Sequence, residues 1–353
     1  MARVDTRCMA QTLDVEIVAL DAHPSDDDVA DVAALAQAVQ DDDRPGDPPL
    51  SVRELAGRMR HSLPEHIART WVARSNGRVV GRVSATVDRR PRNEGFVELD
   101  EVEVHPDDRR RGVATALARR AIAELGPLGA RTIMLWPWDD AGRAFSERLG
   151  LTFRQEERQS RLVVAALDVA QQEQWIAAPK AREAGYRVVS FVEPVPAEHL
   201  DAWVAAKDAM ADAPLDEVEW VHEPTTADWV RNLEELHRAR GVQVFGSLAL
   251  APDGAAAGMT AIFVHADRPR FAHQEDTAVV PAHRGFGLGR WLKAANLRQA
   301  VEAVPEVELV QTYNAESNGP MLDINVAMGF RPARTYYAYQ ADLAAVVAAL
   351  GSE

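Results

Sequence analysis

The sequence predicts an α/β protein made of two tandem units, each a mixed but mostly antiparallel sheet flanked by helices. A motif, V-x-P-x-x-R-x-x-G-x-(G/A)-x-x-L, occurs at residues 104–117 and again at 279–292. Its arginines, Arg109 and Arg284, stand 175 residues apart (284 minus 109). Each copy follows a strand-like run and begins a helix-like run, and the order of elements around the two copies is the same. Together these observations indicate a duplicated fold.

The size and composition of the chain fit two units. The 353 residues are 47% hydrophobic and 26% charged, a globular balance with enough length for two cores. We place the first unit at 13–168, a polar, alanine-rich linker at 169–185 and the second unit at 186–346. No run of 18 or more apolar residues is present, so a membrane span is not expected. The first residues lack the apolar core of a secretion signal.

The first unit is expected to run strand, two helices, hairpin, strand, helix, strand, helix and two final strands. Ser25 before Asp26 is a good helix cap, the Ser-Asn-Gly turn ending at Gly77 predicts a hairpin, and apolar residues recur at four-residue spacing from Val113. Asp41–Asp43 would oppose a helix dipole, so that helix should stop before 44–49. The elements fall at 14–20, 26–40, 52–60, 68–74 with 78–87, 96–104, 112–125, 132–136, 141–149, 151–156 and 160–167.

The second unit repeats this order. Phe96 and Phe271 begin corresponding strands at the same spacing of 175 (271 minus 96). Gly150 and Gly329 close corresponding helices at a spacing of 179 (329 minus 150), so the second copy is about four residues longer there. The predicted elements fall at 186–192, 197–211, 225–240, 242–250 with 257–265, 271–279, 287–303, 307–313, 318–328 and 335–340. A terminal helix ends at Gly351.

Charge and cysteine content exclude several functions. The net charge of −15 disfavours nucleic acid and anionic lipid and favours cationic partners. Cys8 is the only cysteine, so no intramolecular disulfide or thiolate cluster can form, and a reducing, cytoplasmic location is expected. A terminal thiol with no fixed base beside it is a poor nucleophile. The ten histidines show no metal-binding spacing, and no metal site is predicted.

The two glycine loops suit an anion. A strand followed by small residues and a helix start presents free backbone N–H groups to a ligand. The loops are not phosphate loops of the nucleoside triphosphatase type, because the required lysine is missing. They are not dinucleotide loops either, since Leu117 and Leu292 stand where the third glycine belongs and antiparallel strands precede them.

R-x-x-G-x-(G/A) after a strand, followed by a helix, a strand and an (L/M)-G-(F/L) close, resembles the acyl-CoA site of the GNAT acetyltransferase superfamily. The resemblance covers 13–168 and 186–345 and is strongest in 271–332, which is similar to actinobacterial members. It implies that acetyl-CoA is the co-substrate and that the backbone amides of the loops bind its pyrophosphate. The preceding strand would pair with the pantetheine arm. The implied positions are Val104, Arg109, Arg110, Arg111, Gly112, Val113, Ala114, Val279, Arg284, Gly285, Phe286, Gly287, Leu288 and Gly289.

Acetyl transfer needs a neutral amine, so a base must remove a proton. In this family the base often lies on the strand before the loop. Glu275 and Asp276 are the candidates in the second unit, and Glu101 and Glu103 in the first. Strand alternation puts Glu275 and Asp276 on opposite faces, and we favour Asp276 because it corresponds to Glu101. These carboxylates could instead be ordinary surface acids.

The leaving CoA thiolate is often protonated in this family by a tyrosine four residues before the closing glycine. Ser146 and Asn325 occupy those positions here. Either another group serves, such as Tyr313, or the thiolate leaves unaided. Asn318 and Asn325 could hydrogen-bond the CoA arm, and Asn318 could equally cap a helix. An oxyanion would meet a strand N–H near Val279 or Val280.

We therefore predict an acetyl-CoA-dependent N-acetyltransferase that acts on a primary amine of a small molecule by direct transfer. The second unit has the better loop and is expected to catalyse, while the first binds CoA without turnover or only supports the structure. Acids beside an aromatic residue in 210–220 favour a cationic amine, although an exposed acidic loop would look the same. The alternative is a non-catalytic acyl-CoA-binding or regulatory protein. No nucleic-acid or membrane partner is expected, and the chain should be a monomer or a homodimer.

Overall fold

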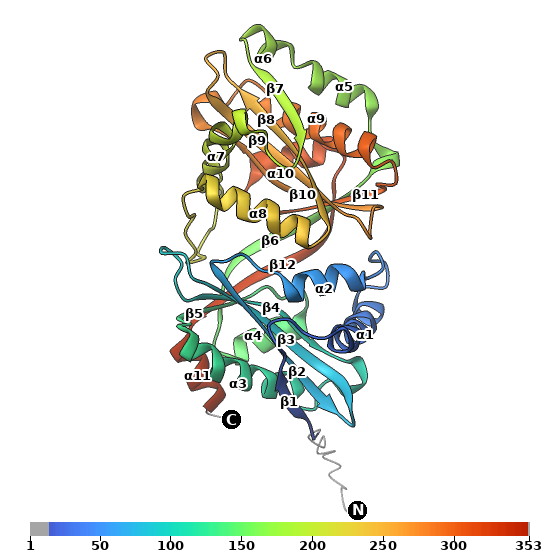
Figure 1. Ribbon diagram of the computed structural model, residues 1–353, viewed down its shortest axis with the longest axis vertical. Coiled ribbons are helices and arrows are strands. Elements are labelled where there is room, and N and C mark those ends of the chain that lie inside the picture. Colours follow the sequence, from blue (N-terminus) through green and yellow to red (C-terminus); the bar gives the residue numbers. More distant parts are fainter. Residues whose placement is uncertain (1–13, 352–353) are drawn as a thin grey trace, which may run out of the picture.

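The computed structural model of the chain describes residues 14–351, which form one long sheet flanked by helices. The N-terminal and C-terminal halves lie end to end along the long axis of the molecule (Figure 1). Cys8 lies outside the described residues. The α/β prediction, with a mostly antiparallel sheet in each half, is confirmed.

The first half contains six strands and four α-helices among the described residues. Its strands are β1 (Glu16–Ala19), β2 (His66–Ser75), β3 (Arg78–Asp88), β4 (Phe96–Val104), β5 (Thr132–Leu135) and β6 (Thr152–Val163). Its helices are α1 (Asp26–Asp43), α2 (Val52–Arg60), α3 (Val113–Leu125) and α4 (Asp140–Arg148). The proposed linker is largely helical, with α5 (Val169–Ala177) and α6 (Pro179–Glu183).

The second half repeats the order. Its strands are β7 (Arg187–Val192), β8 (Val242–Leu250), β9 (Ala256–His265), β10 (Phe271–Val279), β11 (Leu309–Ala315) and β12 (Arg331–Asp342). Its helices are α7 (Leu200–Lys207), α8 (Ala227–Ala239), α9 (Leu288–Ala303), α10 (Gly319–Met328) and α11 (Leu343–Gly351).

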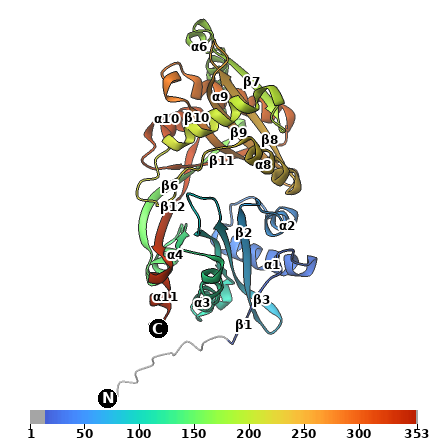
Figure 2. The same cartoon turned by 60° about the vertical axis from the view of Figure 1, so that its left-hand side comes forward.

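The two halves exchange their last strands. The strand order is β1-β2-β3-β4-β5-β12-β6-β11-β10-β9-β8-β7, so β12 pairs with β5 of the first half and β6 pairs with β11 of the second. β6 and β12 pair with each other along most of their length and lie between the halves in both views (Figures 1 and 2). The proposed units 13–168 and 186–346 are therefore joined through a continuous backbone ladder.

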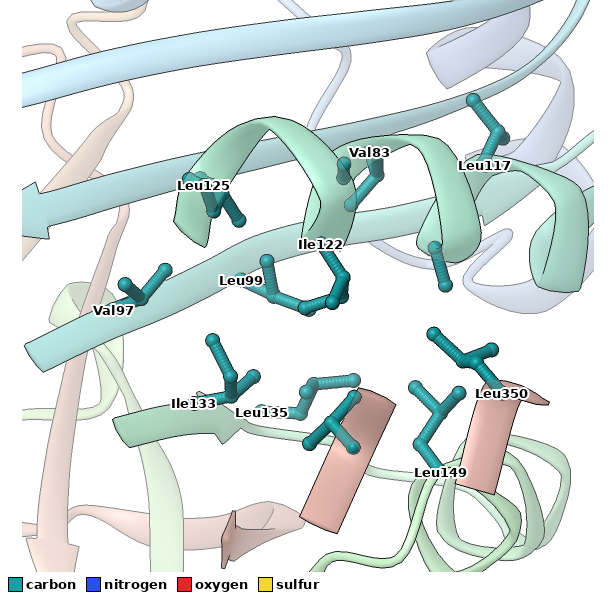
Figure 3. Packing of buried hydrophobic residues seen from close by; sticks show 14 of the residues in the cluster. Val83, Val97, Leu99, Leu117, Ile122, Leu125, Ile133, Leu135, Leu149 and Leu350 are labelled. Atoms are coloured by element: carbon teal, nitrogen blue, oxygen red, sulfur yellow. The ribbon is translucent and has the colours of Figure 1, made fainter. Parts of the chain in front are cut away.

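The core of the first half is completed by the end of the chain. Leu117 and Leu125 of α3 point into the same space as Leu99 of β4 and Leu135 of β5 (Figure 3). Leu350 of α11 belongs to this cluster too, although α11 follows the second half in sequence. Burial of such side chains contributes roughly 1.5–3 kcal/mol each, so α11 helps to stabilise the first half.

Two sequence predictions of local structure were wrong. The last part of the first half was expected to form two strands, at 151–156 and 160–167, but it forms the single strand β6 because its second partner strand comes from the other half. Helix α1 was expected to end before its terminal acids, but it continues through Asp43. Arg109 compensates the unfavourable charge, since it contacts Asp42 at 2.9 Å and Asp43 at 2.8 Å. The Ser25 cap is confirmed by its bond from the Asp28 N–H.

Candidate active site

Each half opens its sheet at the same place. β4 and β5 are parallel and pair only from Phe96 to Leu99, and β10 and β11 pair only from Phe271 to His273. Beyond these points the strands separate, so one edge of β4 and of β10 is left without its parallel neighbour. An extended ligand chain can pair with such an edge as an added strand.

A bulge lies at each opening. In β4 the register shifts at Asp100, between the pairs Ser84–Glu101 and Ala85–Leu99. In β10 it shifts at Glu275 and Asp276, which lie opposite the single residue Ala261 of β9. Asp100 and Glu275 are 175 residues apart (275 minus 100). Because bulges redirect side chains, both halves bring carboxylates to the point where the strands part.

The glycine loops form the predicted helix starts. Gly112 and Gly287 have φ of 84° and 81° and precede α3 and α9, with no side-chain cap at either helix. The first N–H groups of both helices are therefore available to an anion. One position differs between the loops, since Arg110 adopts φ of 61° where the second loop has Gly285. A left-handed non-glycine residue costs about 1–2 kcal/mol, so the second loop is the less strained one.

The loop arginines have two kinds of partner. Nε of Arg109 donates to the Val104 carbonyl at 3.1 Å, and Nε of Arg284 donates to the Val279 carbonyl at 3.1 Å. The remaining donors of Arg109 contact Asp42 and Asp43, and Arg284 contacts Asp212 at 2.7 Å. The structure thus places both arginines as braces between a loop and nearby carboxylates, which leaves the backbone amides as the groups facing an anion.

The linker reaches the second loop. Lys180 of α6 donates to the Gly285 carbonyl at 2.9 Å, and its ammonium lies 5.3 Å from the ring of Phe286. Tyr186 hydrogen-bonds His283 of the same loop at 2.9 Å. The second loop therefore has a lysine beside it that sequence reasoning did not identify, because this lysine precedes its loop by about a hundred residues.

The first half contains a cavity of about 710 Å³ that runs from its glycine loop between the separated strands. A second cavity of about 540 Å³ adjoins it, and both are lined by Arg58, Asp100 and Glu101. Tyr313, predicted to serve the second half, lies on the wall of the larger cavity instead, because β11 continues the exchanged sheet. The structure therefore does not pair Tyr313 with the second glycine loop.

Two of the four candidate bases are held by arginines. Glu101 contacts Arg58 and Arg82, and Glu103 contacts Arg82 at 2.7 Å. Arg82 is itself buried, so both carboxylates are held in fixed ion pairs. In the second half, Asp276 is paired with Lys207 of α7.

Glu275 differs from these acids. No hydrogen bond to its carboxylate occurs among residues 14–351, and loss of hydration in the opening raises its pKa to about 7, with further contributions from Asp276 and Glu157. Glu275 is nevertheless exposed to solvent at the opening, so strands β10 and β11 crowd this carboxylate without enclosing it. The sequence favoured Asp276 over Glu275, but the Lys207 ion pair makes Asp276 the less suitable base.

Sequence reasoning missed two further carboxyls. Burial raises the pKa of Glu98 to about 8, with contributions from Asp100 and Glu157, and burial raises the pKa of Glu157 to about 7. Alternation along β4 could have identified Glu98. No sequence signal could have placed Glu157 near Glu275, since Glu157 belongs to the exchanged strand β6.

The positions expected to contact the thiol or the CoA arm are mostly buried. Ser146 and Asn325 are 0% and 1% exposed, and Asn325 donates to Asn314 at 2.7 Å. Asn318 caps α10, as one reading of the sequence predicted. The N–H of Val280 donates to the Ala257 carbonyl at 3.0 Å, so it is not free for an oxyanion.

The acidic segment 210–220 packs against the first half. Val218 and Trp220 contact the cluster of Phe96 and Met134, and Arg90 lies 5.9 Å from the Trp220 ring. The segment therefore joins the halves, and its aromatic residue already has a cation of the chain beside it. Among residues 14–351 no group of three or more potential ligands could hold a metal ion. The helices described here are all too short or too polar to cross a membrane.

A sheet that opens above a glycine loop, with an acid at a bulge beside the opening, defines an acyl-CoA-dependent acyltransferase. Residues 32–151 and 207–320 match the acetyltransferase (GNAT) family. The chain belongs to the GNAT acetyltransferase family, and it is a tandem member.

Known relatives match most of the length of the chain. A mycothiol acetyltransferase of Nocardiopsis dassonvillei is 32% identical over 85% of this chain and 88% of its own. A mycothiol acetyltransferase of Salinispora tropica is 30% identical over 89% of this chain and 93% of its own. A tandem GNAT protein from the clavulanic acid biosynthesis pathway superposes with a TM-score of 0.77 at 26% identity, over 94% of this chain and 99% of its own. The chain is therefore an enzyme that transfers an acetyl group and uses an acyl-CoA, and nothing in the comparisons supports a purely regulatory role.

Proposed function

We propose that this enzyme transfers the acetyl group of acetyl-CoA directly to a primary amine of a small molecule, and that the second half does so. The observation that carries this proposal is Glu275, which has no hydrogen-bond partner for its carboxylate among residues 14–351, has a pKa raised to about 7, and lies at the bulge where β10 leaves β11. A general base is most effective when its pKa lies near the working pH.

The second glycine loop is proposed to hold the CoA diphosphate. Gly285, Gly287 and Gly289 allow a close approach of the backbone, and the start of α9 offers its N–H groups. Lys180 would add a positive charge beside the loop. The pantetheine arm would pair with β10 up to Val279, at the edge that β11 leaves open.

The chemistry follows from this placement. The amine attacks the thioester carbonyl while Glu275 accepts the proton that the amine loses. The tetrahedral intermediate then collapses, the carbon–sulfur bond breaks, and the CoA thiolate leaves. Since Tyr313 lies in the other cavity and Asn325 is buried, the thiolate is proposed to leave without a protein acid and to take its proton from water.

A cationic acceptor is favoured by the acids at the opening. Lys207 forms an ion pair with Asp276, and its Nζ lies 5.3 Å from the Trp229 ring. Acids and an aromatic ring at this place are therefore the surroundings that favour a cation. Glu275 and Glu157 remain for the acceptor, which would bind as a cation, release one proton to solvent to become the neutral amine, and give its second proton to Glu275 as it attacks.

The first half is proposed to bind CoA without turnover. Its acids Glu101 and Glu103 are fixed by Arg58 and Arg82, so neither is a free base. The single cysteine of the 353 residues is consistent with a cytoplasmic location, and we expect a monomer or a homodimer.

The test is release of CoA thiol from acetyl-CoA in the presence of a panel of small primary amines. The panel should include the amine that yields mycothiol on acetylation, because the relatives named above are mycothiol acetyltransferases. We expect amine-dependent thiol release and an N-acetylated product detected by mass spectrometry. Thiol release that does not depend on any amine, with no acetylated product, would contradict the proposal.

A further inference from the structure

The large cavity of the first half does not end at its own strands. It continues to a polar chamber whose walls come mainly from the exchanged strands and from β11. The chamber is defined here by Gln159 and Arg161 of β6, Gln311 and Tyr313 of β11, and Arg334 and Tyr336 of β12. The chamber forms because the two halves exchange strands β6 and β12. The acyl transfer proposed above does not use it.

Positive charge exceeds negative charge around the chamber. Asp47 alone faces three guanidinium groups: Arg161 at 2.6 Å, Arg334 at 3.5 Å and Arg44 at 3.9 Å. The nearby carboxylate of Glu54 is taken by Arg268 at 2.8 Å. All these side chains are a quarter exposed or less, so solvent screens their charges poorly. Four guanidinium groups and two carboxylates leave an excess of two positive charges.

Two hydrogen-bond donors beside the chamber are poorly satisfied. Nη1 of Arg334 and Nε of Arg44 are buried, reach Asp47 only at 3.5 Å and 3.9 Å, and form no hydrogen bond with the described residues. Buried donors of this kind cost about 1–3 kcal/mol each and usually have an explanation. An acceptor supplied by a ligand would explain them.

The Tyr313 hydroxyl is arranged as a donor. It accepts hydrogen bonds from Nε2 of Gln159 at 2.8 Å and from Nε2 of Gln311 at 2.7 Å. With both of its acceptor positions used, the hydroxyl can only donate, and the neighbouring Tyr336 hydroxyl lies within reach of that proton. Burial raises the pKa of Tyr313, so the hydroxyl keeps that proton at neutral pH. Gln159 is 2% exposed, and its Oε1 has no hydrogen-bond partner among residues 14–351.

We propose that the chamber binds the carboxylate of a small-molecule ligand. Arg334 and Arg161 would supply forked N–H donors that match the two carboxylate oxygens, and Tyr313 would add a hydroxyl donor. Because the chamber is continuous with the acyl-CoA cleft of the first half, the carboxylate is either the far end of a dicarboxylic acyl group on CoA or part of a separate ligand. The first of these rests on the proposed binding of CoA by the first half.

The experiment measures binding by calorimetry in a Gly287→Glu background, which removes the loop of the second half. Acetyl-CoA, succinyl-CoA, and free succinate added after saturation with CoA are compared. We expect succinyl-CoA to bind at least tenfold more tightly than acetyl-CoA, and Arg334→Gln to reduce this ratio below threefold. Arg187→Gln, an exposed arginine on β7, is the matched control and should leave the ratio unchanged.

The outcomes separate the possibilities. Free succinate that binds the CoA-loaded protein, and loses binding on Arg334→Gln, would support the chamber with a separate ligand. Equal affinity for both thioesters together with no succinate binding would overturn the proposal. A preference for succinyl-CoA over acetyl-CoA that persists in both Arg334→Gln and Tyr313→Phe would overturn the proposal too. If Arg334→Gln does not fold, Tyr313→Phe alone still tests the chamber. Failure of acetyl-CoA itself to bind would instead contradict CoA binding by the first half.

Discussion

Replacing Glu275 with glutamine is expected to slow acetyl transfer by a factor of about 10²–10⁴, the usual contribution of a positioned general base. Glutamine keeps the size of the side chain but cannot accept the proton of the amine. The carboxylate makes no hydrogen bond to the described part of the chain, so the substitution should not disturb packing.

The pH dependence gives the sharper test. Loss of hydration, with contributions from Asp276 and Glu157, raises the pKa of Glu275 to about 7. Because the ionised form is the base, kcat/KM should rise with pH and level off above about 7. The ionised fraction would fall from about 91% at pH 8 to about 9% at pH 6, so kcat/KM should drop about tenfold over that interval. Glu275→Gln should remove this limb of the profile.

The matched control is Asp100→Asn, at the corresponding bulge of the first half. It should leave kcat/KM within about threefold of the wild-type value. If Glu275→Gln kept the wild-type kcat/KM and the wild-type rise near pH 7, Glu275 would not be the base. If Asp100→Asn lost as much activity as Glu275→Gln, catalysis could not be assigned to the second half alone.

Three other predictions concern the loops and the fold. Gly287→Glu should abolish acetyl transfer while Gly112→Glu leaves most of it, and Gly254→Glu, a turn glycine with φ of 88°, controls for strain alone; equal loss from both loop variants with folding intact would overturn the assignment. Burial raises the pKa of Glu98 to about 8, so the folded state holds a proton that the unfolded state releases above about 4.5. The free energy of unfolding should therefore fall as pH rises from about 4.5 to about 8, by at most about 1.4 kcal/mol per pH unit from Glu98. Glu98→Gln should raise the urea midpoint at pH 8.5 but not at pH 4.5. Leu117→Ala, fully buried, should lower the free energy of unfolding by about 2–5 kcal/mol within one transition of the whole chain, whereas two separate transitions would show that the halves unfold independently.

Local patterns predicted most of the elements. The glycine of the 75–77 turn, the Ser25 cap and the four-residue spacing from Val113 each act over a few residues, so sequence alone locates β2, β3, α1 and α3. The repeat at a spacing of 175 also located both glycine loops, since duplicated sequence folds in the same way.

Strand exchange could not be predicted, because β6 fits either β5 or β11 equally well by pattern. Only the assembled sheet shows that β12 separates β6 from β5. The surroundings of two candidate-site residues follow from this exchange. Tyr313 lines the cavity of the other half, and Glu157 lies near Glu275. Lys207, about 70 residues earlier in the chain, pairs with Asp276, and sequence alone could not show this ion pair, which is why we propose Glu275 as the base instead.

Titration of the wild-type protein with acetyl-CoA in a calorimeter tests the central claim most directly, because the free N–H groups at the starts of α3 and α9 are the features that the account assigns to the CoA diphosphate. We predict saturable binding at two sites per chain, one of which disappears in Gly112→Glu and the other in Gly287→Glu. Absence of saturable binding, or binding that neither substitution alters, would contradict the account.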